Sequence, residues 1–111
     1  MTNPTDRELL EMAAKACGIT GIPMELAGGD PALYVRDNAL GIWAPLIDDA
    51  DAFRLAVRLE LDIMHRVVGG ERVEVLAPGG PKVIEYHSGE TDAATRRAIV
   101  RAAAALGEKQ S

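Results

Sequence analysis

Helix-capping signals constrain the fold of this 111-residue chain more than any other feature. The first is a capping box, Thr5-Asp6-Arg7-Glu8, in which the Thr5 hydroxyl can accept from the Glu8 amide while the Glu8 carboxylate accepts from the Thr5 amide. Apolar residues then recur at helical spacing, and Gly18 follows as a terminator. The segment predicts a helix over residues 6–17.

Two further helix starts lie in the middle and near the end of the chain. Asp48 is a predicted N-cap, and Asp49 and Asp51 place negative charge at the positive end of the helix dipole. Thr91 caps a third helix that we expect to run through residues 92–106 and to end at Gly107. The predicted order is therefore helix, strands, helix, strands, helix.

The segments between these helices have the alternation and the turn residues of strands. Arg72-Val73-Glu74-Val75 alternates polar with apolar residues, which predicts one solvated face, whereas Val83-Ile84 suggests burial on both faces. We therefore expect an α+β fold in which a largely antiparallel sheet is sandwiched by helices. The predicted strands are residues 24–26, 32–36 and 40–43 before the second helix, and residues 63–68, 72–76 and 82–86 after it.

Length and composition indicate a single domain over residues 1–111, ordered over about residues 5–107 with short polar tails. The chain is 48% hydrophobic and 26% charged, as in ordinary globular domains. Its net charge of −5 opposes non-specific binding to nucleic acid or to an anionic membrane. No apolar stretch is long enough to span a membrane, and a single cysteine suits a reducing cytosol, so we expect a cytoplasmic protein.

A cluster of aspartates at the second helix start resembles the head of a calcium loop. Phe53 and Arg54, however, stand where an EF-hand loop needs an oxygen ligand and a glycine. Helix capping is therefore the favoured interpretation of Asp48, Asp49 and Asp51.

The remaining reactive side chains do not form a recognisable catalytic or metal site. His65 and His87 supply two of the three or four donors that a zinc site needs. Cys17 has no histidine at a recognisable spacing to activate it, and we expect it to be structural. We expect no catalytic residues, no metal ligands, no cofactor and no enzyme activity; a small hydrolase or metal enzyme using the two histidines is the least favoured hypothesis.

Two features suggest contacts with other molecules. Arg96, Arg97 and Arg101 cluster on the third helix and could touch phosphate, although a solvated charged face is the usual meaning of such a cluster. Trp43, near Pro45, is either a core residue, which we favour, or an anchor for a protein partner.

Three segments resemble a family of small phage and prophage proteins of bacteria, the phage ABA sandwich domain family. They are residues 6–19, residues 43–57 from Trp43-Ala44-Pro45-Leu46 onward, and residues 93–104 around Arg96-Arg97 and Arg101. Relatives in that family often have Asn where this chain has Ala44. The resemblance implies a sheet between helices and implies no activity.

The resemblance implies a phage or prophage accessory protein, and we expect it in the bacterial cytoplasm. We expect it to be non-enzymatic and to act through protein–protein contacts, with a phage or host protein or with a second copy of itself as a homodimer. The alternative is a nucleic-acid-associated phage factor that uses Arg96, Arg97 and Arg101.

Overall fold

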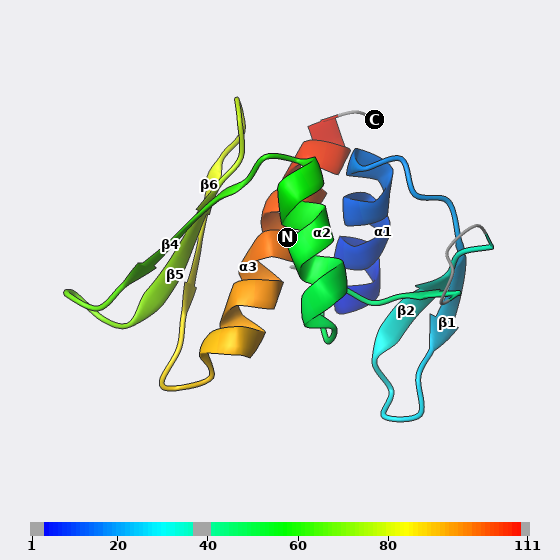
Figure 1. Ribbon diagram of the computed structural model, residues 1–111, viewed down its shortest axis with the longest axis horizontal. Helices are drawn as coiled ribbons and strands as arrows, with labels where there is room; N and C mark the ends of the chain where they lie inside the picture. The colour runs from blue at the N-terminus through cyan, green and yellow to red at the C-terminus, as the bar shows by residue number, and fades with distance from the viewer. Residues whose placement is uncertain (1–3, 37–40, 110–111) are drawn as a thin grey trace.

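The computed structural model describes residues 4–36 and 41–109 and confirms the α+β class and the order of its elements (Figure 1). Residue 40, the first residue of the strand predicted over residues 40–43, lies outside the described residues. The described elements are α1 (Asp6–Ala16), β1 (Ile22–Glu25), β2 (Pro31–Tyr34), β3 (Ile42–Trp43), α2 (Asp49–Arg58), β4 (Asp62–Arg66), β5 (Arg72–Leu76), β6 (Lys82–Tyr86) and α3 (Thr91–Lys109).

The strands are antiparallel throughout, and in the described ranges they form two three-stranded sheets, β1-β2-β3 and β4-β5-β6. The layering differs from the expected one, because the helices lie between the two sheets instead of covering both faces of one sheet (Figure 1). The reason is visible in β6, where Val83 is buried and its neighbour Ile84 is exposed. The second sheet therefore has one buried and one solvated face.

The starts of α1 and α2 follow the predicted capping chemistry, whereas Thr91, the predicted cap of the third helix, is the first residue of α3. The Thr5 Oγ1 accepts from the Glu8 amide at 3.1 Å, and the Thr5 amide donates to Glu8 Oε1 at 2.9 Å. In α2, the Asp48 carboxylate accepts from the Asp51 amide at 3.2 Å. Asp48 therefore caps α2, which is the interpretation that the sequence favoured over a calcium loop.

The C-terminal helix is longer than predicted. Gly107 lies inside α3, which continues to Lys109, and does not terminate it. The interior position has a packing reason: a Cβ on Gly107 would lie 2.9 Å from the carbonyl carbon of Met12. The glycine permits close approach of α1 and α3, not a change of chain direction.

The core surrounds α3, which packs against α1, α2 and the second sheet. Ala98, Ala102 and Ala103 are fully buried beside Ile99, so this face of α3 lies in the core. Val73 and Val75 supply the inner face of β5. None of the described helices is long and apolar enough to cross a membrane.

Candidate interaction surface

The arginines predicted from the third helix are engaged within the fold. Arg96 donates from Nε to the Leu46 carbonyl oxygen at 3.0 Å and from Nη1 to the Asp49 carboxylate at 2.6 Å. It therefore ties α3 to the start of α2. The Arg96 side chain is mostly buried, while that of Asp49 is exposed.

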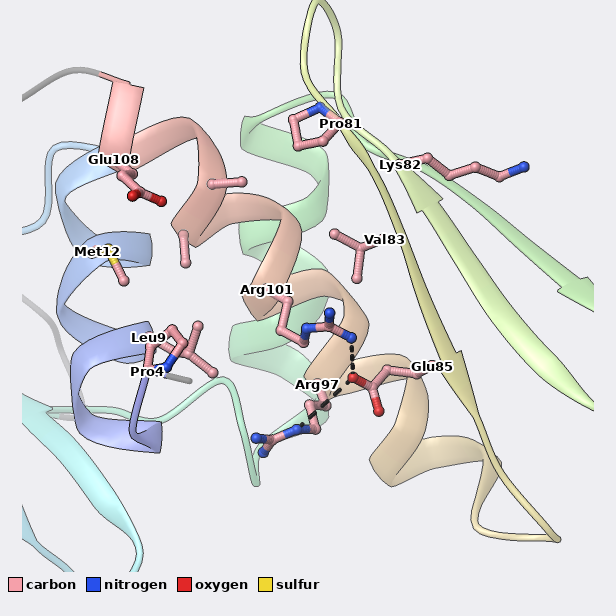
Figure 2. Close-up of a pocket in the computed structure, with 12 residues that line it drawn as sticks. Pro4, Leu9, Met12, Pro81, Lys82, Val83, Glu85, Arg97, Arg101 and Glu108 are labelled. Atoms are coloured by element: carbon pink, nitrogen blue, oxygen red, sulfur yellow. Dashed lines mark hydrogen bonds and ion pairs between the residues drawn. The ribbon is translucent and has the colours of Figure 1, made fainter. Parts of the chain in front are cut away.

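Arg97 and Arg101 converge on one carboxylate, that of Glu85 on β6 (Figure 2). Arg97 also pairs with Asp6 at 2.9 Å, which links α3 to α1. Arg101 donates to Glu85 and, at 3.1 Å, to the carbonyl oxygen of Ile84. Arg101 thus turns toward the second sheet, while the Arg97 and Arg101 side chains stay partly exposed at 40% and 39%. All three arginines of the predicted phosphate site have an acidic partner on another element.

A groove of about 590 Å³ lies where these arginines meet α1 and β6 (Figure 2). Its apolar wall includes Leu9 and Met12 of α1 and Val83 of β6. Its polar end holds Arg97 and Arg101 with Glu85 already between them. An anionic ligand would have to compete with that carboxylate, so the groove is not a ready anion site.

Trp43, the other predicted contact residue, is 5% exposed and belongs to the hydrophobic core. The core interpretation of Trp43 is confirmed, and its ring is not available to a partner in the folded chain. The next residue, Ala44, donates its amide to Asp51 Oδ2 at 2.9 Å, which fastens this loop to α2. Burial raises the pKa of the Asp51 carboxyl.

The solvated face of the second sheet carries an ion cluster that the sequence analysis did not find. Glu74 lies at its centre and accepts from Arg72 at 2.8 Å, from Lys82 at 2.9 Å and from Arg66 at 3.3 Å. The Lys82, Arg72 and Arg66 side chains lower the pKa of Glu74 to about 2. The Glu74 side chain is 4% exposed, whereas those of Arg66 and Lys82 are 49% and 48% exposed. A partner would therefore meet the cations first.

The strand registers define this outer face of the second sheet. Met64 and Ile84 are the cross-strand neighbours of Glu74, and residues two positions away on each strand share its face. Tyr86 is 66% exposed on it. The outer face therefore comprises Asp62, Met64, Arg66, Arg72, Glu74, Leu76, Lys82, Ile84 and Tyr86, and the exposed Val67 and Val68 follow at the adjoining hairpin loop.

The two histidines line one small cavity of about 260 Å³ beside the β4–β5 loop. His87 Nδ1 lies 3.8 Å from a Glu71 carboxylate oxygen. Within residues 4–36 and 41–109, no group of three or more His, Cys, Asp or Glu is placed to hold a metal ion. Cys17 is buried, its Sγ lies 3.6 Å from the Ala14 carbonyl oxygen, and burial raises the pKa of its thiol, which suits a packing role.

Comparisons with known proteins do not extend these observations. No protein-family model matches the chain, and searches of curated proteins and of solved structures find no significant match. The resemblance to the phage ABA sandwich domain family therefore stays a prediction from the sequence.

Proposed function

We propose that this chain is a non-enzymatic phage or prophage accessory protein of the bacterial cytoplasm. It acts by binding a protein partner on the outer face of the second sheet. The observation that carries the proposal is the ion cluster on that face. Three cations cover the Glu74 carboxylate, and exposed apolar side chains, including that of Tyr86, lie beside them. Aromatic and arginine side chains are the usual anchors of protein interfaces.

The charge of this face defines the partner. The chain as a whole carries a net charge of −5, yet Arg66 and Lys82 expose positive charge above a carboxylate that is almost fully covered. An acidic protein surface with an apolar centre is complementary to this arrangement. The phage setting comes from the sequence resemblance alone.

The nucleic-acid alternative has less support from the contacts. Arg96, Arg97 and Arg101 are each paired with a carboxylate of another element, so phosphate would have to displace those partners. The acidic net charge of the chain also opposes association with a polyanion. These contacts favour a protein partner.

Affinity capture from a host carrying an induced prophage tests the proposal when two aromatic variants are compared. Tyr86→Ala removes an anchor from the outer face, and Phe53→Ala removes a similarly exposed aromatic ring from α2. A partner identified by mass spectrometry should be retained by Phe53→Ala and lost by Tyr86→Ala and by Lys82→Glu. With the purified partner, binding should weaken as salt is raised.

Three results would overturn the proposal. Equal affinity of the identified partner for wild type, Tyr86→Ala and Lys82→Glu would place the interface elsewhere. Loss of binding in Phe53→Ala alone would move it to α2. Recovery of nucleic acid as the sole salt-sensitive ligand would favour the alternative.

A further inference from the structure

Among the described strands, four lie at sheet edges: β1, β3, β4 and β6. Three of these edges are poorly suited to pairing with another chain. Pro23 interrupts β1 and lacks an amide donor, and β3 has only two residues. On β6, the carbonyl oxygen of Ile84 already accepts from Arg101. The edge that remains is β4 (Figure 1).

The backbone of β4 presents hydrogen-bonding groups to this edge. At the end of the neighbouring ladder, the His87 amide donates to the Glu71 carbonyl oxygen at 3.1 Å. Hydrogen-bonded and non-hydrogen-bonded pairs alternate along an antiparallel ladder. Counting from this bond along both registers, Met64 bonds to β5, whereas Ile63 and His65 point their N–H and C=O groups outward. No described strand pairs with them there.

We propose that a second copy of this chain pairs with this edge, β4 against β4, antiparallel about a two-fold axis through Met64. Ile63 then exchanges backbone hydrogen bonds with His65 of the partner subunit, and the same bonds form again across the axis. Asp62 lies opposite Arg66 of the partner subunit, in a non-hydrogen-bonded pair, where side chains approach most closely. Arg66 also donates to Glu74 of its own chain through Nε, but its half-exposed guanidinium has further N–H donors for Asp62, so two ion pairs flank the axis.

The charge pattern of β4 selects this register. The side chains of two paired residues must point to the same face of the sheet. A two-fold axis perpendicular to the sheet must therefore pass through a residue of β4 and not between two residues. An axis through Ile63 places Asp62 opposite Met64, and an axis through His65 places Asp62 opposite Val68. Only the axis through Met64 matches Asp62 with Arg66 on both sides. Asp62 is exposed and has no ion-pair partner elsewhere in the described chain, so it is available for this contact.

The dimer would change the surface that the protein displays. The two-fold axis runs perpendicular to the β4-β5-β6 sheet and joins this sheet of one copy to the same sheet of the other copy. The result is one six-stranded sheet with both outer faces on the same side. Two Glu74 clusters would then face one partner together. The dimer does not rest on the outer-face partner of the proposed function, because its backbone hydrogen bonds use the edge of β4; only the Asp62 and Arg66 side chains belong to the outer face as well.

The oligomeric state of the full chain in solution tests the pairing. Multi-angle light scattering should give a mass that rises with concentration toward twice the 11.8 kDa of one chain, up to about 1 mM protein. His65→Pro removes an outward amide and leaves the groups that bond to β5 unchanged, so it should be monomeric with an unchanged circular dichroism spectrum. Wild type that stays monomeric, or a folded His65→Pro that dimerises as well as wild type, would overturn the proposal.

A charge-reversal pair keeps the test decisive if His65→Pro does not fold. Asp62→Lys places a lysine opposite Arg66 of the partner subunit at both symmetry-related positions. The repulsion should weaken dimerisation by about 10-fold or more. Glu25→Lys makes the same charge change on the exposed strand β1 and should leave dimerisation unchanged. The reverse result would place the interface on β1. Tyr86→Ala should dimerise normally, so failure to find an outer-face partner and failure to dimerise can be told apart.

Discussion

Gly107 of α3 packs directly against the backbone carbonyl group of Met12 on α1. A Cβ at residue 107 would overlap the carbonyl oxygen and would also lie 3.3 Å from the Ala16 amide nitrogen. The contact lies one helical turn beyond Ala103, which is itself fully buried. Small residues on consecutive turns of α3 therefore set the distance between the two helices.

We predict that Gly107→Ala destabilises the fold although alanine is the better helix former. The added methyl group must push α1 and α3 apart, at a cost of roughly 1 to 3 kcal/mol in the free energy of unfolding. Gly28→Ala is the matched control, since its Cβ would meet only the Asp30 carboxylate at 3.5 Å. Urea unfolding of both variants measures the difference. If Gly107→Ala were as stable as Gly28→Ala, the helices would be farther apart than described.

A second pair of variants tests the rotation of α3. Ala102 has no exposed surface, so Ala102→Leu should overpack the core and lower the free energy of unfolding by roughly 1 to 3 kcal/mol. Arg101→Ala removes a partly exposed ion pair with Glu85 and should cost only about half a kcal/mol. Thermal or urea melts of both decide the matter. A tolerated Ala102→Leu beside a damaging Arg101→Ala would mean that the arginine holds α3 to the second sheet more strongly than packing does.

The sequence predicted those features that depend on neighbours along the chain. The capping box at Thr5 and the N-cap at Asp48 need residues three positions away, and both were found. The Glu74 cluster could not be found in this way, because Arg66 and Lys82 reach Glu74 only through the cross-strand register. Gly107 has the local pattern of a helix terminator, because its contact with Met12 joins the two ends of the chain and leaves no signal in the neighbouring residues. The layering of helices and sheets could not be predicted for the same reason, since hairpin signals do not say which strands share a sheet.

The arginines of α3 give a third prediction, which concerns nucleic acid. Because Arg96, Arg97 and Arg101 are held by carboxylates, we expect no binding of single-stranded DNA or RNA through them at low ionic strength. Fluorescence anisotropy with a labelled oligonucleotide measures this. If binding did occur and its salt slope fell by about one in Arg97→Ala, the arginines would contact phosphate and the nucleic-acid alternative would gain support.

The Glu74 cluster makes the stability of the fold depend on pH in a defined direction. The pKa of Glu74 is lowered from 4.5 to about 2 in the folded chain, so the folded state favours the ionised carboxylate more than the unfolded chain does. The resulting stabilisation is fully present above pH 4.5 and is lost as the pH falls toward 2. Glu74 is the one carboxylate of the cluster, so its protonation removes the negative charge that Arg66, Arg72 and Lys82 contact.

Comparison with Glu74→Gln isolates this contribution, since glutamine keeps the size of the side chain and carries no charge. The variant should be less stable than wild type above pH 4.5, because three cations then surround a neutral group. The difference between the two proteins should shrink steadily below pH 4.5 and become small near pH 2, where protonation of Glu74 in the folded wild type is under way. Other titrating groups, including Asp51, are common to both proteins and largely cancel in the comparison. Urea midpoints measured across this range test the prediction, and a difference that does not change with pH would mean that the cations do not hold Glu74 ionised.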